Sequence, residues 1–60
     1  MEEIMEYKGY KGTVEYSDRD STYFGKVLDI KGLVSYEGRT REELKNDFEG
    51  AVDEYIDLLN

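Results

Sequence analysis

The longest regular pattern of apolar positions in this chain lies in its last third. Between Thr40 and Leu59 the apolar side chains recur at steps of one, three and four residues, which places them on one side of a helix. They are Leu44, Phe48, Ala51, Val52, Tyr55, Ile56 and Leu59. Thr40 and Glu43 have the spacing of a capping box, in which the threonine hydroxyl accepts from the Glu43 backbone N–H. The pattern predicts an amphipathic helix over 40–59, with Gly50 as a weak position inside it.

Three shorter segments before this helix alternate as β-strands do. They are 10–16, 22–28 and 33–37. The polar run 17–21 is short enough to close a hairpin between the first two. Segment 1–6 is too short to be an element of its own and is expected to be a frayed lead-in or an extension of the first strand.

The predicted strands differ in what their two faces carry. In 10–16, Tyr10, Gly12, Val14 and Tyr16 share one face, and in 22–28, Tyr23, Gly25 and Val27 share one face while Phe24, Lys26 and Leu28 share the other. Gly25 indicates that another group packs closely over the sheet at that point.

The order of these elements predicts an α+β fold, a three-stranded antiparallel sheet with one long helix on one face. Residues 1–60 are expected to form a single domain, in which 1–6 can remain flexible. The other sheet face would stay uncovered and carry Phe24 and Leu28, with Ile30 and Leu33 adding to it. An apolar patch of this kind usually marks an interface.

The net charge of the chain limits the classes of partner that it is expected to bind. Fifteen acidic against eight basic residues give a net charge of −7, which opposes binding to the phosphates of nucleic acids or to anionic membranes. A basic protein would be steered toward such a surface, although the ordinary explanation of the excess is that it keeps a small protein soluble. No apolar run approaches the ~18 residues of a membrane span. Residues 1–4 lack the features of a signal peptide, so the chain is expected to be cytoplasmic.

Candidate chemistry is limited by the residues that are missing. The chain has no cysteine and no histidine, which excludes disulfides, thiolate metal sites and the usual nucleophile and base pairs. No enzymatic activity, cofactor or metal is therefore expected, with a carboxylate-only divalent-metal site as the one alternative. A domain of this size has a small core, so a partner, either another protein or a second copy, is the expected source of further stability.

Four segments, in their order and spacing, resemble the N-terminal domain of HicB-like antitoxins. They are 7–16 (YKGYKGTVEY), 23–27 (YFGKV), 36–40 (YEGRT), and Glu42-Glu43-Leu44 leading to 51–55 (AVDEY). The resemblance covers 7–59 and implies a partial RNase H-like fold without the nuclease carboxylates. It also implies a type II toxin–antitoxin role, in which the domain binds HicA, a small basic mRNA interferase, and masks its RNA-binding surface. Family members usually continue into a DNA-binding domain, whereas this sequence ends at Asn60, so no operator binding is expected of these residues.

The sequence therefore predicts an antitoxin that masks a small basic RNA-cleaving toxin. The expected contact residues are Phe24, Lys26, Leu28, Asp29 and Ile30, with Glu15 and the helix acids steering the partner. Two alternatives remain open. One is an oligomerisation module that buries the same face against its own copy, and the other is a degenerate RNase H-like enzyme with a carboxylate-bound metal.

Overall fold

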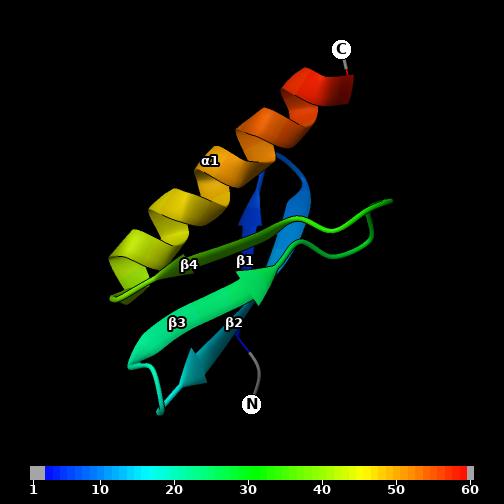
Figure 1. Cartoon of the computed structure of the whole chain (residues 1–60). Coiled ribbons are helices and arrows are strands. Elements are labelled where there is room, and N and C mark those ends of the chain that lie inside the picture. Colours follow the sequence, from blue (N-terminus) through cyan, green and yellow to red (C-terminus); the bar gives the residue numbers. More distant parts are fainter. Residues whose placement is uncertain (1–2, 60) are drawn as a thin grey trace.

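The structure, a computed structural model, describes residues 3–59 of the chain. Four strands and one helix make up this part (Figure 1). The elements are β1 (Glu3–Tyr7), β2 (Tyr10–Ser17), β3 (Thr22–Lys26), β4 (Ser35–Gly38) and α1 (Arg41–Leu59). The strands form one sheet in the order β1-β2-β3-β4, and each neighbouring pair is antiparallel. The fold is α+β, an open antiparallel sheet with one C-terminal helix, as predicted, but the sheet has four strands and not three.

The additional strand is β1, in the segment expected to be a frayed lead-in or an extension of the first strand. It pairs with β2 from Glu3↔Val14 to Tyr7↔Tyr10, so that expectation is wrong over 3–6, while residues 1 and 2 lie outside the described part. Lys8 and Gly9 connect the two strands with φ angles of 52° and 83°. Two consecutive positive φ angles are typical of the type I′ turn, whose twist matches that of a hairpin. Gly9 meets that requirement without strain.

The core lies between α1 and one face of the sheet. Its buried residues are Val27, Tyr36, Leu44, Phe48 and Val52. The helix therefore buries the predicted stripe at Leu44, Phe48 and Val52, and Ile56 is half-buried against the core, but Leu59 is 61% exposed. Figure 1 shows why, since the C-terminal end of α1 extends past the sheet. The predicted cap is also present, because the Glu43 backbone N–H donates to Thr40 Oγ1 at 3.1 Å.

The connection between β3 and β4 is longer than predicted. β3 ends at Lys26 and β4 begins at Ser35, and the intervening segment projects beyond the sheet (Figure 1). Val27 still lies in line with the sheet, since it bridges Gly12 and its N–H donates to the Val34 carbonyl at 2.9 Å. The segment 28–32 then turns the chain back.

A tyrosine side chain crosses the sheet between β4 and β2. Continuous pairing of β2 with β3 covers Glu15↔Phe24 to Ser17↔Thr22, with one further bridge at Gly12. Between these points the hydroxyl of Tyr36 donates to the Thr13 carbonyl oxygen at 2.7 Å, over Gly25. The backbone N–H of Lys26 donates to Thr13 Oγ1 at 3.0 Å. The close packing predicted at Gly25 is therefore confirmed, and two hydroxyl groups complete the interrupted pairing.

Candidate functional site

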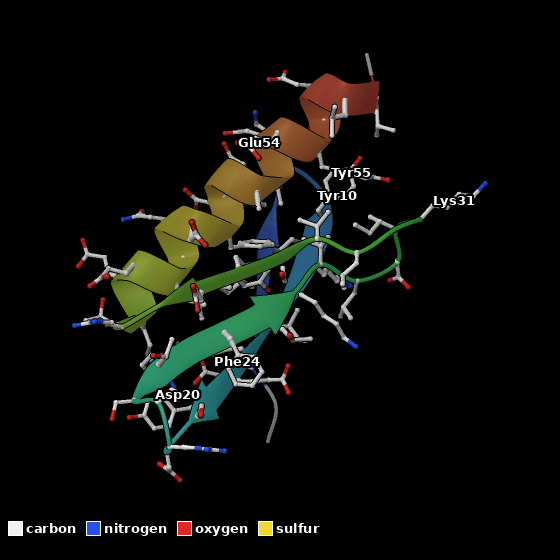
Figure 2. The ribbon with its side chains drawn as sticks, in the orientation of Figure 1. Tyr10, Asp20, Phe24, Lys31, Glu54 and Tyr55 are labelled. Atoms are coloured by element: carbon white, nitrogen blue, oxygen red, sulfur yellow. The ribbon has the colours of Figure 1, made fainter. Side chains whose placement is uncertain are left out.

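On the sheet face that α1 leaves uncovered, three neighbouring strands place one aromatic and two acidic side chains in a row. The register pairs Glu15 of β2 with Phe24 of β3, and Phe24 with Glu37 of β4. Side chains directly opposite each other in neighbouring strands point to the same face. Phe24 is 40% exposed and lies on the side of β3 that faces away from α1 (Figure 2). An aromatic ring is therefore placed between two carboxylates on an open surface.

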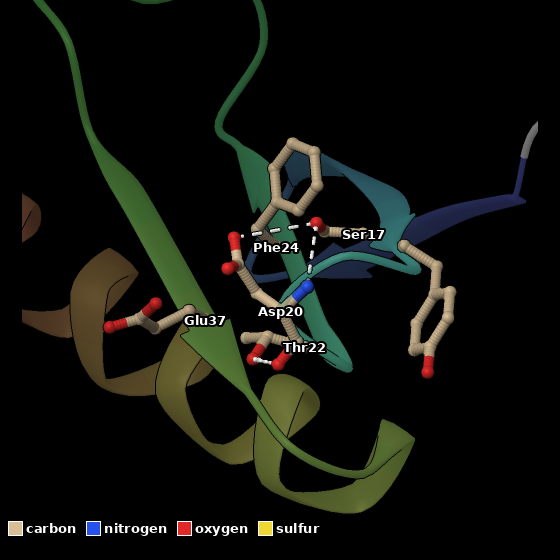
Figure 3. A pocket seen from close by; sticks show the side chains of 6 residues that line it. Ser17, Asp20, Thr22, Phe24 and Glu37 are labelled. Carbon is tan, nitrogen blue, oxygen red and sulfur yellow. Dashed lines mark hydrogen bonds between the residues drawn. The ribbon is translucent and has the colours of Figure 1, made fainter.

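An open hollow of about 530 Å³ adjoins this row at the β2–β3 turn (Figure 3). It is lined by Tyr16, Ser17, Asp20, Thr22, Phe24 and Glu37, and is called the Phe24 hollow below. Asp20 is held in place by its neighbours: its N–H donates to Ser17 Oγ at 3.3 Å, and Ser17 Oγ donates to Asp20 Oδ2 at 3.4 Å. Thr22 Oγ1 donates to the Asp20 carbonyl at 2.9 Å. The turn thus places a second carboxylate in the hollow, beside that of Glu37.

The next row on the same face contains Lys26. Its side chain is exposed, and with Glu3, Thr13, Val14 and Glu15 it lines a second, smaller hollow. Glu15 Oε2 accepts from Thr13 Oγ1 at 3.4 Å. The structure therefore brings three of the predicted contact residues, Glu15, Phe24 and Lys26, together on the uncovered face.

The other three predicted residues lie in the connection after β3. Leu28 is half-buried, and its backbone N–H donates to the Lys11 carbonyl at 2.7 Å, which continues the line of the sheet. Asp29 is exposed and has a φ of 57°. Ile30 packs against the core cluster, so it contributes less exposed apolar surface than the sequence predicts. The reason is that the chain turns back after Asp29 and brings the next side chain over the core.

Sequence reasoning missed Asp20 and Glu37. Glu37 was within a predicted strand, but its place beside Phe24 depends on the register between β3 and β4, which alternation along one strand does not define. Asp20 lies in a polar turn that predicted only a hairpin. The one local signal was its spacing of three residues from Ser17, which is typical of side chains that bond within a turn.

Some acids of the helix have structural partners. Lys8 Nζ lies 2.9 Å from Asp53 Oδ1, and the hydrogen bond from Lys8 lowers the pKa of the Asp53 carboxyl below its ordinary value. Arg41 pairs with Glu3 at the opposite end of β1. Asp47 Oδ2 accepts from the Glu37 backbone N–H at 2.9 Å, which covers part of the exposed edge of β4. The helix acids therefore fasten the helix to both edges of the sheet, in addition to any steering of a partner.

The described residues also provide evidence on metal sites, membrane-spanning helices and buried polar groups. Within 3–59, no three acidic side chains converge to hold a metal ion. No described helix is long and apolar enough to cross a membrane. Among these residues no charged side chain is buried, and the hydroxyl of Tyr36 belongs to a buried core residue.

Comparison with protein-family models, with curated proteins and with solved structures gave no match.

Proposed function

We propose that this chain is the toxin-binding domain of a HicB-like antitoxin, which binds a small basic RNA-cleaving protein and catalyses no reaction itself. The observation that carries the proposal is the uncovered sheet face, where Phe24 is exposed between Glu15 and Glu37. Exposed aromatic side chains at the centre of a surface are frequent anchors of protein interfaces. Flanking carboxylates select a partner of opposite charge.

Electrostatics support a basic partner. Among residues 3–59 the ion pairs join Lys8 to Asp53 and Arg41 to Glu3. The carboxylates around Phe24 are therefore not neutralised by these contacts, and the whole chain carries a net charge of −7. A protein that binds RNA presents lysine and arginine side chains to phosphates. An acidic face that engages the same side chains would compete directly with the RNA.

The partial RNase H-like fold belongs to the same proposal. It rests on the resemblance of 7–59 to the HicB-like domain, and an open antiparallel sheet with one helix on one face is compatible with it. In this arrangement the helix completes the core on one side. The opposite face is then free to serve as the binding surface.

Co-expression with the small basic protein encoded beside its gene tests the proposal. We expect the two proteins to co-purify as a stable complex and RNA cleavage by the basic protein to be suppressed when the complex forms. Replacing Phe24 by lysine should weaken the complex, because it puts a positive charge at the centre of the acidic face. Replacing the exposed helix residue Asp57 by lysine makes a control on another surface. Absence of a complex together with undiminished cleavage would contradict the proposal.

Self-assembly is the second candidate function, because a separate apolar surface favours it. Leu33 and Leu58 are 82% and 85% exposed. They line an open groove of about 340 Å³ between the β3–β4 connection and the end of α1, together with Val34, Ala51 and Tyr55 and the polar residues Ser35 and Glu54. Light scattering on the isolated chain tests this alternative: a dimer or larger assembly supports it, and a monomer at high concentration contradicts it.

A further inference from the structure

We infer that the Phe24 hollow receives an arginine side chain of the partner, with the guanidinium stacked on the Phe24 ring and bonded to the carboxylates beside it. The inference deepens the proposed function and rests on it for the identity of the partner, but the arginine site can be tested separately. It assigns a specific role to Glu37 and Asp20, which the sequence did not single out.

The spacing of the row suits a planar cation. Neighbouring strands lie about 4.8 Å apart, so the backbones of Glu15 and Glu37 are separated by about 10 Å with Phe24 midway. A guanidinium over the ring can donate in its own plane to carboxylates on either side, through charge-assisted bonds of about 2.8 Å. Its flat face meanwhile lies on the aromatic ring, where a cation within about 6 Å of the centroid is attracted to it.

Asp20 adds a third carboxylate to those of Glu15 and Glu37, and it lies on one side of the row. Asp20 lines the hollow with Glu37 and Phe24, and Ser17 holds its carboxylate at the edge of the turn. A guanidinium has five N–H donors in a rigid fork, so it can engage several acceptors at once. The ammonium group of lysine is a compact and more strongly hydrated charge, and it gains less from an aromatic ring. The surroundings therefore favour arginine over lysine.

The sheet contains an example of the same arrangement on its other face. The guanidinium carbon of Arg41 lies 5.8 Å from the centroid of the Tyr23 ring, and the guanidinium pairs with the Glu3 carboxylate. Tyr23 is the residue next to Phe24 in β3 and points to the opposite face. An arginine between an aromatic ring of β3 and a carboxylate of the sheet is thus already part of this fold. On the uncovered face the ring and the carboxylates are present, and the arginine would come from the partner.

A metal ion would be a poorer occupant. Hard cations such as Mg²⁺ and Ca²⁺ require several oxygen ligands that converge on one point. Within the described range no group of three acidic side chains does so. An exposed aromatic ring between separated carboxylates fits an organic cation instead.

Nuclear magnetic resonance on the isotopically labelled chain provides the direct test. The probe is a blocked Gly-Arg-Gly peptide, compared with the same peptide containing lysine or citrulline. We expect the arginine peptide to shift the amide signals of Glu15, Phe24 and Glu37 in a saturable manner. The lysine peptide should bind about 3-fold or more weakly, and the neutral citrulline peptide should produce no saturable shift. Equal binding of the arginine and lysine peptides, or shifts that map to another surface, would overturn the inference.

Substitutions make the test specific to the residues named. Phe24→Leu removes the ring but keeps an apolar side chain, and Glu37→Gln removes one charge but keeps the shape. Each should weaken the arginine peptide by about 3-fold or more. Asp57→Asn removes the same charge from an exposed site on α1 and should change binding by less than about 2-fold, since exposed charges beyond a Debye length are screened. An equal loss in Asp57→Asn and Glu37→Gln would show that only net charge matters and would overturn the inference. If Phe24→Leu fails to fold, Asp20→Asn and Glu37→Gln, which alter the two carboxylates that line the hollow, test the arginine site.

The same variants separate this inference from the proposed function. If the basic protein binds wild type, Phe24→Leu and Glu37→Gln equally well, the antitoxin proposal stands and the arginine site is wrong. If the arginine peptide binds at the hollow but the basic protein forms no complex, the arginine site stands and the antitoxin proposal is wrong.

Discussion

The hydroxyl of Tyr36 donates a hydrogen bond of 2.7 Å to the carbonyl oxygen of Thr13, although the two residues lie on strands that are not neighbours. Tyr36 belongs to β4 and Thr13 to β2, and the side chain passes over Gly25 of β3. The ring of Tyr36 packs on Phe48 of α1, with their centroids 5.1 Å apart. One side chain therefore joins three strands to the helix, beneath the surface that carries the candidate site.

Replacing Tyr36 by phenylalanine tests the importance of this bond. The ring and its packing are kept, but the Thr13 carbonyl loses its partner in a site that water does not reach easily. We expect the free energy of unfolding to fall by about 1–3 kcal/mol, the usual cost of an unsatisfied buried polar group. Urea denaturation followed by circular dichroism measures the change. Tyr16→Phe is the matched control and should have little effect, because Tyr16 is 48% exposed. Equal stability of wild type and Tyr36→Phe would contradict this account.

Because of the same hydroxyl, the free energy of unfolding should depend on pH in the alkaline range. Burial raises the pKa of Tyr36 from its ordinary value of 10.0 to about 12. Because the pKa is higher in the folded state, the contribution of the neutral hydroxyl is fully present below pH 10 and is lost as pH rises toward 12. We expect wild type to lose stability over this range by more than Tyr36→Phe does. Urea denaturation at stepped pH values shows this, and parallel curves for the two proteins would contradict it.

The two glycines beneath Tyr36 should not tolerate alanine. A Cβ on Gly12 would lie 2.6 Å from Phe48 Cε1, and one on Gly25 would overlap the Thr13 carbonyl. Crowding of this kind costs about 1–3 kcal/mol, enough to unfold much of a marginal domain of this size. We expect Gly12→Ala and Gly25→Ala to lower the thermal midpoint strongly, as measured by circular dichroism.

Gly50 provides the opposite case and serves as the control. It lies in the middle of α1, and a Cβ there would meet no atom within 4 Å. Gly50→Ala should therefore stabilise the chain by about 0.5–1 kcal/mol, since alanine has the higher helix propensity. If all three substitutions had the same effect, close packing would not be the cause.

The ion pair between Lys8 and Asp53 should stabilise the fold by an amount that decreases at acidic pH and at high salt. The pKa of Asp53 is lowered, mainly by the hydrogen bond from Lys8, so its contribution is present above the ordinary value of 3.8 and is lost as pH falls through the lower folded value. We expect Asp53→Asn to be slightly less stable than wild type at neutral pH and low salt. The difference should shrink at acidic pH, where Asp53 is protonated, and at high salt, because the pair is exposed and therefore screened. Asp57→Asn, at an exposed helix position, is the control. Thermal melts at several pH values and salt concentrations make the measurement.

Serine at both Leu33 and Leu58 tests the apolar groove at the end of α1. The two side chains are 82% and 85% exposed, so their replacement should leave the free energy of unfolding of the monomer nearly unchanged, within about 0.5 kcal/mol. If the chain self-assembles through this groove, the double substitution should convert the assembly to monomer in light scattering. An assembly that persists unchanged would show that the groove is not its interface.

Local patterns in the sequence determined the helix, its cap and the faces of the central strands. The stripe from Leu44 to Val52 is buried as its spacing predicts, and Thr40 caps the helix. Alternation also placed Phe24 and Lys26 on the face away from the helix. These features follow from periodicity within one segment, because a helix or strand that buries one face must repeat its apolar positions with the period of its own backbone.

The tertiary structure alone decided which segments pair and in what register. β1 is a strand because β2 pairs with it, and Glu15 and Glu37 flank Phe24 because of two separate registers. The reach of Tyr36 to Thr13 likewise depends on the strand between them. The physical reason is that register is set by how side chains of distant segments pack together, and the local sequence of a single strand contains only its half of that relationship.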